Sequence, residues 1–280
     1  MIKFKNLDKL VQLAINEDLG NDFIDITTDA ILEDEKIVVS LKAKEKIIFC
    51  GKEIIIYIFN KIDKNLKLNF FKNDGELLLK GEEIVEIEGK GSSIFKGERI
   101  ILNFVQRMSG IATKTKKFVD LLDSDKIKIL DTRKTLPGYR YLDKYSVKIG
   151  GGTNHRMNLN ELVMIKDNHK KIAGGIKNAV DKIKSSNINK DIEVEVETRR
   201  EAEIASKLNI DIIMLDNMDN EMIKKATRII RKNNPEIKIE ISGNINDERL
   251  KNLNTLDIDY ISVGALTHSV RAADISLNIK

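Results

Sequence analysis

The sequence predicts an α/β protein in which an α+β unit is followed by a parallel (β/α) barrel. In the first third, short strand-like segments are separated by glycine-containing turns, which is typical of an antiparallel sheet. Beyond Asp125, six short apolar segments alternate with amphipathic helical segments, which is typical of parallel βαβ units. The 280 residues are enough for one large domain or two modest ones.

The first third is expected to open with an amphipathic helix that Asn6 can cap. The pattern then predicts a strand over 37–43 and a helix over 52–62. Three more short segments are expected to form strands of the same sheet, at 67–71, 76–80 and 84–89. A long helix over about 93–122 carries an apolar stripe and is expected to link the two halves of the chain.

The second half contains six expected strands, at 127–130, 162–165, 192–196, 212–215, 237–241 and 260–263. Charged or polar side chains follow nearly every one of them. The strands of a barrel all open their carboxyl ends on one face, where active sites are built. A doubly wound sheet, the alternative, would gather only the residues near its switch point. The distribution of polar residues therefore favours a barrel.

Five cationic or protonatable side chains lie in these loops: Arg133, Lys134, His155, Arg156 and Lys166. If they converge on one mouth of the barrel they repel one another, unless an anion lies between them. The alternative is that each of these cations pairs with a nearby acid. This explanation is less convincing for five residues together than for one residue alone. Because arginine binds planar carboxylates through two parallel hydrogen bonds, the pattern predicts a ligand with carboxylate groups, with phosphate as a further candidate.

Acidic residues alternate with apolar ones in the expected strand over 192–196. Glu193, Glu195 and Glu197 share one face of a strand that a parallel sheet buries on both sides. Unpaired ionised carboxylates are costly there, so interior bases or a metal must neutralise them. Asp216 ends the next strand, and with Glu195 it offers the hard oxygen ligands that Mg²⁺ prefers. A helix N-cap is the alternative role for Asp216.

Small residues follow the last two expected strands, namely Ser242, Gly243 and Asn244 after one and Gly264 after the other. Backbone N–H groups exposed in such loops can bind phosphate, and the last two strands of a barrel are the usual place. A tight turn alone would explain the glycine in either segment. Two such segments in consecutive loops favour a phosphate site. The sequence has neither a Walker loop nor a GxGxxG motif, which argues against a nucleotide triphosphatase or a dinucleotide dehydrogenase.

Composition excludes several other classes. With 41% hydrophobic and 33% charged residues, the chain is globular rather than disordered. Cys50, the single cysteine, cannot form an internal disulfide, and with no signal segment apparent a reducing cytoplasm is expected. No apolar run approaches the ~20 residues that cross a bilayer. Nucleic acid is not an expected partner, because lysines such as Lys114, Lys116 and Lys117 more simply coat a solvated helix face.

The order and spacing of several segments resemble those of the quinolinate phosphoribosyltransferase family: QRMSG, DTRKTLPGYR, GGGTNHRMNL, MIKDNH, EVEVE, MLDN, SGNI and VGALTHS. The resemblance covers essentially the whole chain. It implies an N-terminal α/β sandwich domain over 1–110, an incomplete barrel of six or seven strands over 111–269, and a tail over 270–280 that returns to the first domain. It also implies a homodimer, with a hexamer as the larger alternative, in which each active site faces the partner's N-terminal domain.

The resemblance assigns roles to individual residues. The pyridine dicarboxylate is assigned to Arg133, His155, Arg156 and Lys166, with Arg107 reaching it from the neighbouring subunit. Lys134 is placed between the dicarboxylate and the phosphoribosyl donor. Glu195 and Asp216 match the acids that hold the ribose hydroxyls and magnesium pyrophosphate. The loops around the 5-phosphate are matched by Ser242, Gly243, Asn244, Gly264 and His268.

The reaction implied by the resemblance is decarboxylating phosphoribosyl transfer to quinolinate in NAD biosynthesis, with Mg²⁺ as the cofactor. A phosphoribosyltransferase that uses nicotinate or another carboxylated base is the alternative. Arg133, Arg156 and Lys166 together exceed what one carboxylate needs, which favours a ligand with two.

Overall fold

The computed structural model describes residues 7–280, and the chain divides into two compact units. The first unit comprises Met1–Lys116, Thr135–Gly151 and Ala265–Lys280, and the second comprises Lys117–Lys134 and Gly152–Gly264. Each unit thus draws on separate segments, whereas the ranges expected from the sequence, 1–110, 111–269 and 270–280, divide the chain at single points. Asn6, the expected cap of the first helix, lies outside the described residues.

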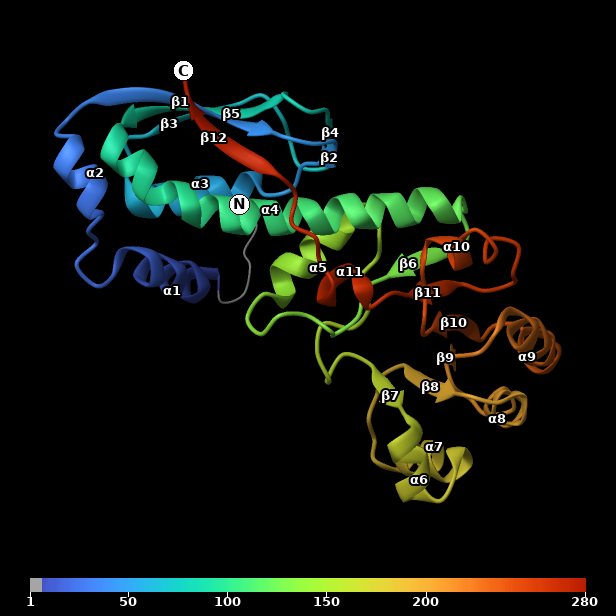
Figure 1. Ribbon diagram of the computed structural model, residues 1–280. Helices are drawn as coiled ribbons and strands as arrows, with labels where there is room; N and C mark the ends of the chain where they lie inside the picture. The colour runs from blue at the N-terminus through green and yellow to red at the C-terminus, as the bar shows by residue number, and fades with distance from the viewer. Residues whose placement is uncertain (1–6) are drawn as a thin grey trace. The chain divides into compact units, whose positions relative to one another are not determined.

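The first unit contains a four-stranded antiparallel sheet of order β12-β1-β5-β3 (Figure 1). Its strands are β1 (Lys36–Ala43), β3 (Lys67–Phe70), β5 (Glu83–Lys90) and β12 (Ile275–Ile279). Helix α3 (Lys52–Ile62) and the first part of α4 (Gly91–Leu122) lie along one face of this sheet (Figure 1). The other helices of the unit are α1 (Leu7–Leu19), α2 (Ile26–Ile31), α5 (Arg140–Ile149) and α11 (Ala265–His268). Helix α1 is amphipathic as expected, because every fourth residue from Leu7 to Leu19 is buried.

The expected strand over 76–80 is shorter than the sequence indicates. Only β4 (Leu77–Leu78) is extended, and it pairs with β2 (Ile47–Ile48) in a separate two-stranded sheet. Leu78 is fully buried while Leu77 is half exposed. A run of three leucines shows apolar character but not the alternation of polarity that would indicate which strand is its neighbour.

The last residues of the chain form β12, which pairs with β1 from Ala43 opposite Ile275 to Val39 opposite Ile279. The segment before β12 crosses α4 at Gly110. A Cβ atom at Gly110 would lie 2.2 Å from the carbonyl oxygen of Arg271, so only glycine allows this close approach.

The second unit contains a six-stranded parallel sheet of order β6-β11-β10-β9-β8-β7. Its strands are β6 (Lys128–Leu130), β7 (Val163–Ile165), β8 (Ile192–Val196), β9 (Ile212–Asp216), β10 (Lys238–Ser242) and β11 (Tyr260–Ser262). Strands β7 to β11 lie in chain order and β6 pairs with β11, which is the order of a barrel rather than of a sheet that reverses at a switch point. Within the described residues β6 and β7 do not pair, so the barrel is incomplete. The predicted fold class is confirmed.

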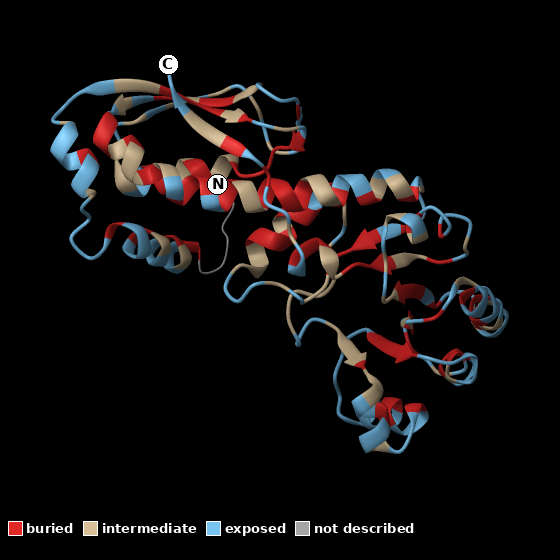
Figure 2. Cartoon of the chain, viewed as in Figure 1, coloured by how far each residue is buried: buried red, intermediate tan, exposed pale blue. Residues whose placement is uncertain are grey.

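Helices connect these strands: α6 (Asp167–Ala173), α7 (Ile176–Ser185), α8 (Arg199–Ala205), α9 (Asn220–Asn233) and α10 (Asp247–Leu250). Figure 2 shows most of these strands buried, β7 mostly intermediate, and the outer faces of α8 and α9 exposed. All residues of β8 are buried, as expected for a parallel strand that is covered on both faces. In residues 7–280, no helix is both long enough and apolar enough to cross a bilayer.

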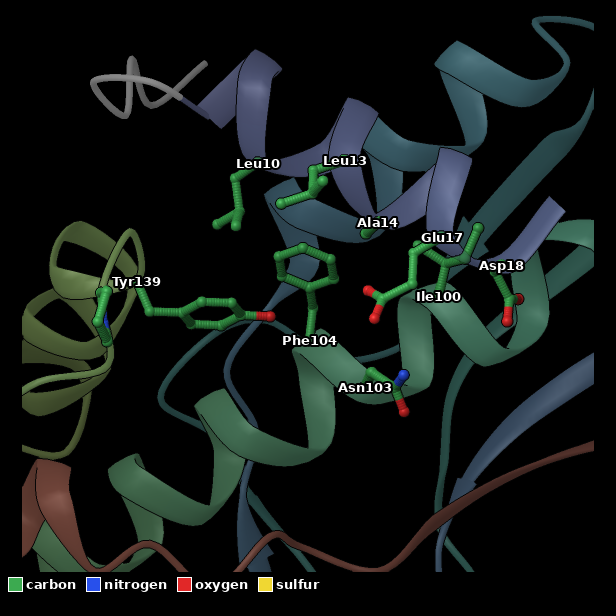
Figure 3. Close-up of a pocket in the computed structure, with 10 residues that line it drawn as sticks. Leu10, Leu13, Ala14, Glu17, Asp18, Ile100, Asn103, Phe104 and Tyr139 are labelled. Carbon is green, nitrogen blue, oxygen red and sulfur yellow. The ribbon is translucent and has the colours of Figure 1, made fainter. Parts of the chain in front are cut away.

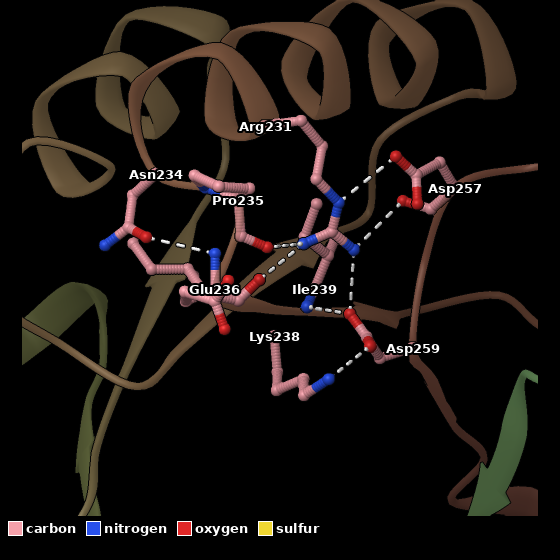
Figure 4. A network of polar contacts seen from close by, with 9 residues as sticks. Arg231, Asn234, Pro235, Glu236, Lys238, Ile239, Asp257 and Asp259 are labelled. Carbon is pink, nitrogen blue, oxygen red and sulfur yellow. Dashed lines mark hydrogen bonds and ion pairs between the residues drawn. The ribbon is translucent and has the colours of Figure 1, made fainter.

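Arg231 ties the end of α9 to the neighbouring strands (Figure 4). Its guanidinium donates to Asp259 Oδ2 at 2.9 Å and to Asp257 Oδ2 at 3.1 Å. Asp259 also accepts hydrogen bonds from the backbone N–H of Ile239 and from Lys238. Burial alone would raise the pKa of Asp259, but these hydrogen bonds lower it below its ordinary value.

Candidate active site

Two arginines, one in the loop after β6 and one in the segment that precedes β7, lie close enough to interact electrostatically. Arg133 comes shortly after β6, and its buried Nε has no hydrogen-bond partner among the described residues. Arg156 donates from Nη1 to the carbonyl oxygen of Leu162 at 2.9 Å. Burial and the charge of Arg133 lower the pKa of the Arg156 guanidinium. A pair of partly buried cations with an unpaired donor favours an anion between them.

Asp131 fixes the turn over 153–156, which carries Arg156. Its buried carboxylate accepts the backbone N–H of His155 at 3.0 Å and contacts the side-chain amide of Asn154. The backbone N–H of Asp131 also donates to the carbonyl oxygen of Thr153 at 3.2 Å. These contacts join the turn to the end of β6, so they set the position of Arg156.

The acids expected at the ends of β8 and β9 come together. Glu195 is buried and forms an ion pair with Lys166, which follows β7. Carboxylate oxygens of Glu195, Glu197 and Asp216 lie within 4.8 Å of one another. Three oxygen donors at this spacing fit the ligand preferences of Mg²⁺, and Lys166 supplies one positive charge to the group.

His155 directs its ring toward carboxylates in the interior of the sheet. Its Nε2 lies 3.2 Å from Glu193 Oε2 and 3.4 Å from Glu240 Oε2. Burial alone would lower the pKa of His155, but the two carboxylates raise it to about 9. The backbone N–H of Arg156 lies 2.7 Å from Nδ1 and opposes protonation of that nitrogen. Nε2 therefore carries a proton in either charge state of the ring.

The first of the two small-residue loops follows β10. Ser242 ends this strand and is in register with Asp216 of β9, so the loop begins next to the acidic group. Gly243 has a φ of 91°, and a Cβ atom there would lie 2.1 Å from Asn217 Oδ1. Asn244 donates from Nδ2 to the same oxygen at 3.3 Å. The loop therefore has a conformation that requires glycine at one position.

Lys134 and Gly264 also belong to the second unit. Lys134 is exposed, and its backbone N–H donates to Thr132 Oγ1 at 3.1 Å. Gly264 follows β11.

Two predicted site residues, Arg107 and His268, belong to the first unit. Arg107 forms a bidentate ion pair with Asp143, with both N···O distances 2.9 Å, and donates to the carbonyl oxygen of Thr267 at 3.0 Å. Burial raises the pKa of Asp143, although the hydrogen bonds from Arg107 oppose this effect. His268 is exposed, and its Nδ1 lies 2.7 Å from Ser269 Oγ.

Comparisons with known proteins identify the family. Family models described as the N-terminal and C-terminal domains of quinolinate phosphoribosyl transferase match residues 25–109 and 111–278. This chain belongs to the quinolinate phosphoribosyltransferase family. A probable carboxylating nicotinate-nucleotide pyrophosphorylase of Bacillus subtilis is 40% identical, over 98% of this chain and 93% of its own length. A mitochondrial decarboxylating quinolinate phosphoribosyltransferase 2a of Nicotiana tabacum is 42% identical, over 98% and 82%.

Solved structures agree with membership of the quinolinate phosphoribosyltransferase family. The nicotinate-nucleotide pyrophosphorylase from Ehrlichia chaffeensis matches with a TM-score of 0.94 and 39% identity, over 100% of both chains. Human nicotinic acid phosphoribosyltransferase matches with a TM-score of 0.64 and 12% identity, over 90% of this chain and 71% of its own, which shows a shared fold alone. The fold by itself therefore does not choose between the two pyridine substrates.

Several residues of this family member contact predicted site residues but were given no role from the sequence. Glu240 alternates with Ile239 and Ile241 just as Glu195 alternates with its neighbours, and this alternation could have revealed it. The roles of Asp131 and Asp143 depend on partners that are distant in sequence, so no local pattern indicates them.

A pocket in the first unit differs from the expected active site in the charge of the side chains that line it (Figure 3). It is lined by Leu10, Leu13, Ala14, Glu17, Asp18, Ile100, Asn103, Phe104, Pro137 and Tyr139. These described residues include two carboxylates and no cation. The pocket does not fit the dicarboxylate that the quinolinate phosphoribosyltransferase family is expected to bind.

Proposed function

We propose that this chain transfers the phosphoribosyl group of phosphoribosyl pyrophosphate to quinolinate with loss of CO2, giving nicotinate mononucleotide and pyrophosphate. Relatives that are 40% and 42% identical over 98% of the chain are named for this enzyme class. The structural observation that supports the proposal best is the buried, unpartnered Nε of Arg133 beside the Arg156 guanidinium. A planar carboxylate satisfies such donors through paired hydrogen bonds.

The two carboxylates of quinolinate are assigned to Arg133, His155, Arg156 and Lys166, of which His155 directs its Nε2 toward interior carboxylates. Lys166 also forms an ion pair with Glu195. Nicotinate has only one carboxylate, so it would leave a donor of Arg133 or of Arg156 without an acceptor, which is costly. This difference favours the dicarboxylate. Lys114 and Lys117, which raised the nucleic-acid alternative, are engaged within the chain with the carbonyl oxygens of Ala265 and Ser269 and with Asp247.

Glu195 and Asp216 hold the ribose hydroxyls and stabilise the positive charge that develops on the sugar. Their oxygens, together with those of Glu197, are a donor set that suits Mg²⁺, which when bound would neutralise charge on the pyrophosphate. The 5-phosphate is assigned to the loop of Ser242, Gly243 and Asn244 and to Gly264 and His268.

In the proposed reaction the quinolinate nitrogen forms a bond to the anomeric carbon while the bond to pyrophosphate breaks and its electron pair leaves with pyrophosphate. The ribosylated ring nitrogen is then cationic. It stabilises the electron pair left on the adjacent ring carbon when that carbon's carboxylate departs as CO2. A proton must then reach this carbon. Lys134, which lies beside Arg133 in the chain, is assigned this role, with water as the alternative.

The active unit is proposed to be a homodimer in which Arg107 reaches the dicarboxylate of the neighbouring subunit, with hexamers of such dimers as the alternative. Asp143 holds the Arg107 guanidinium in one orientation, which supports a recognition role. The cytoplasmic location stays a prediction that rests on Cys50, which is free and buried.

Incubation of the purified protein with quinolinate, phosphoribosyl pyrophosphate and Mg²⁺ tests the function. CO2 and pyrophosphate should form in equal amounts, and chelation of the metal should stop the reaction. Replacement of quinolinate by nicotinate should give little pyrophosphate. Faster turnover of nicotinate, or pyrophosphate release without CO2 from quinolinate, would contradict the proposal.

A further inference from the structure

Glu193 and Glu240 are buried carboxylates that the proposed reaction does not use. Both are fully buried, and apart from the His155 ring their oxygens have no partner within residues 7–280. They come from β8 and β10, yet both approach the same atom, His155 Nε2. Burial raises the pKa of Glu193, and two carboxyl groups so sparsely paired do not favour folding, so a contribution to stability does not account for them.

The three side chains have the spacing of a metal site, because their ligand atoms lie within 4.8 Å of one another. The hydrogen bond at the other ring nitrogen argues against a metal. The backbone N–H of Arg156 points to Nδ1, which places the ring proton on Nε2. A protonated nitrogen cannot bind a metal ion, so the cluster is one donor between two acceptors.

We propose that Glu193 and Glu240 are positioning residues that hold the His155 ring and, through it, the turn over 153–156 that presents Arg156. This inference rests on the proposed dicarboxylate site. Arg156 is joined to His155 by one peptide bond and by its N–H to Nδ1, so rotation of the ring would disturb the Arg156 backbone. Asp131 holds the backbone of the same turn, at the N–H of His155. Asp131 thus holds the backbone of His155, while Glu193 and Glu240 hold its ring.

Two substitutions of Glu240 distinguish a positioning role of its side chain from a packing role. Glu240→Met has nearly the same shape but no oxygen, while Glu240→Gln keeps a polar oxygen that can face Nε2–H. We expect Glu240→Met to weaken quinolinate binding about tenfold, measured by calorimetry without phosphoribosyl pyrophosphate, and Glu240→Gln to stay within about threefold of the unaltered protein. The melting temperature and the KM for phosphoribosyl pyrophosphate should change little in both variants.

A double-mutant cycle with His155→Ala tests whether Glu240 acts through the ring. In the His155→Ala background, Glu240→Met should have no further effect on quinolinate binding. Lys238→Met, which removes an exposed charge from the same strand, is the control and should bind quinolinate normally. Equal effects of Glu240→Met with and without His155 would overturn the proposal, as would normal binding by Glu240→Met.

The test also distinguishes failure of this inference from failure of the site itself. If Arg156→Ala binds quinolinate normally, the dicarboxylate site is misplaced and both proposals fall. If Arg156→Ala loses binding while Glu240→Met does not, only the positioning role falls. Stoichiometric metal in the purified protein that Glu240→Gln releases would show that the cluster is a metal site, which also overturns the inference.

Discussion

Arg133 carries a buried donor without a partner, and such donors are rare in folded proteins because their desolvation is costly. Its place just after an apolar strand, and that of Arg156 after the glycine run over 150–152, led us to predict both as site residues, and their roles stay predictions. The direction of the His155 ring was not predictable, because Glu193 and Glu240 determine it from two other strands. Chain position thus indicates which loop carries a residue, whereas tertiary partners determine how its side chain is oriented.

Arg156→Ala should lower kcat/KM for quinolinate by more than about 10²-fold, because loss of a buried charge contact is worth about 3 kcal/mol or more. Arg156→Lys should recover only part of the activity, since lysine lacks the planar pair of donors. Steady-state kinetics and circular dichroism measure activity and folding. Lys207→Ala, which removes an exposed ion pair with Glu203, is the matched control. Near-normal turnover in Arg156→Ala would exclude it from the site.

Gly243→Ala should disturb the loop proposed to hold the 5-phosphate. The added Cβ would lie 2.1 Å from Asn217 Oδ1, and the positive φ is itself strained for alanine. We expect the KM for phosphoribosyl pyrophosphate to rise about tenfold or more, with quinolinate binding nearly unchanged. If both substrates weaken equally, the loop is not specific to the phosphoribosyl donor.

Among the elements, those with a clear hydrophobic period were predicted and those without it were not. The six strands of the second unit and the long helix α4 appear where apolar segments indicated them. Strand β4 differs because its three leucines do not alternate with polar residues. Arg231, which connects α9 to the strands, has no local signal, because Asp257 and Asp259 lie after the next strand.

Asp259→Asn should destabilise the second unit by about 2 kcal/mol at neutral pH, because it removes a carboxylate that accepts hydrogen bonds from two cations. The folded-state pKa of Asp259 is lowered, so its contribution is present above the unfolded pKa and is lost as pH falls through the folded one. The difference in free energy of unfolding should therefore be constant at neutral pH and shrink below about pH 4. Denaturant titrations of both proteins at several pH values measure this difference in the free energy of unfolding. A difference that does not change with pH would contradict the proposed role of the Asp259 carboxylate.

Across the whole molecule, the chain passes from the first unit to the second and back twice, and its final return is the segment Ala265–Lys280. The return depends on one residue of α4, since the backbone before β12 passes where a side chain at Gly110 would be. No apolar pattern in the sequence indicates this crossing. Membership of the family was nevertheless predictable, because its eight motifs follow one another in order between Gln106 and Ser269.

Gly110→Ala should displace the segment that leads to β12 and lower the free energy of unfolding by about 2 kcal/mol, as overpacking does in a tight core. Limited proteolysis should then cleave the chain near Arg271 faster than it cleaves the unaltered protein there. Asn103→Ala, at an exposed position of the same helix, is the control and should shift stability by less than about 0.5 kcal/mol. Equal proteolysis of the two variants would argue against a close crossing.

The position of β12 has a consequence for synthesis. On the ribosome, β1 is made early, whereas its neighbour β12 emerges only after the entire parallel sheet has been translated. Until then one edge of β1 stays open, and open edges pair readily with other chains. A nascent polypeptide released by a stop codon just before Ile275 would keep that edge permanently and would be prone to aggregate.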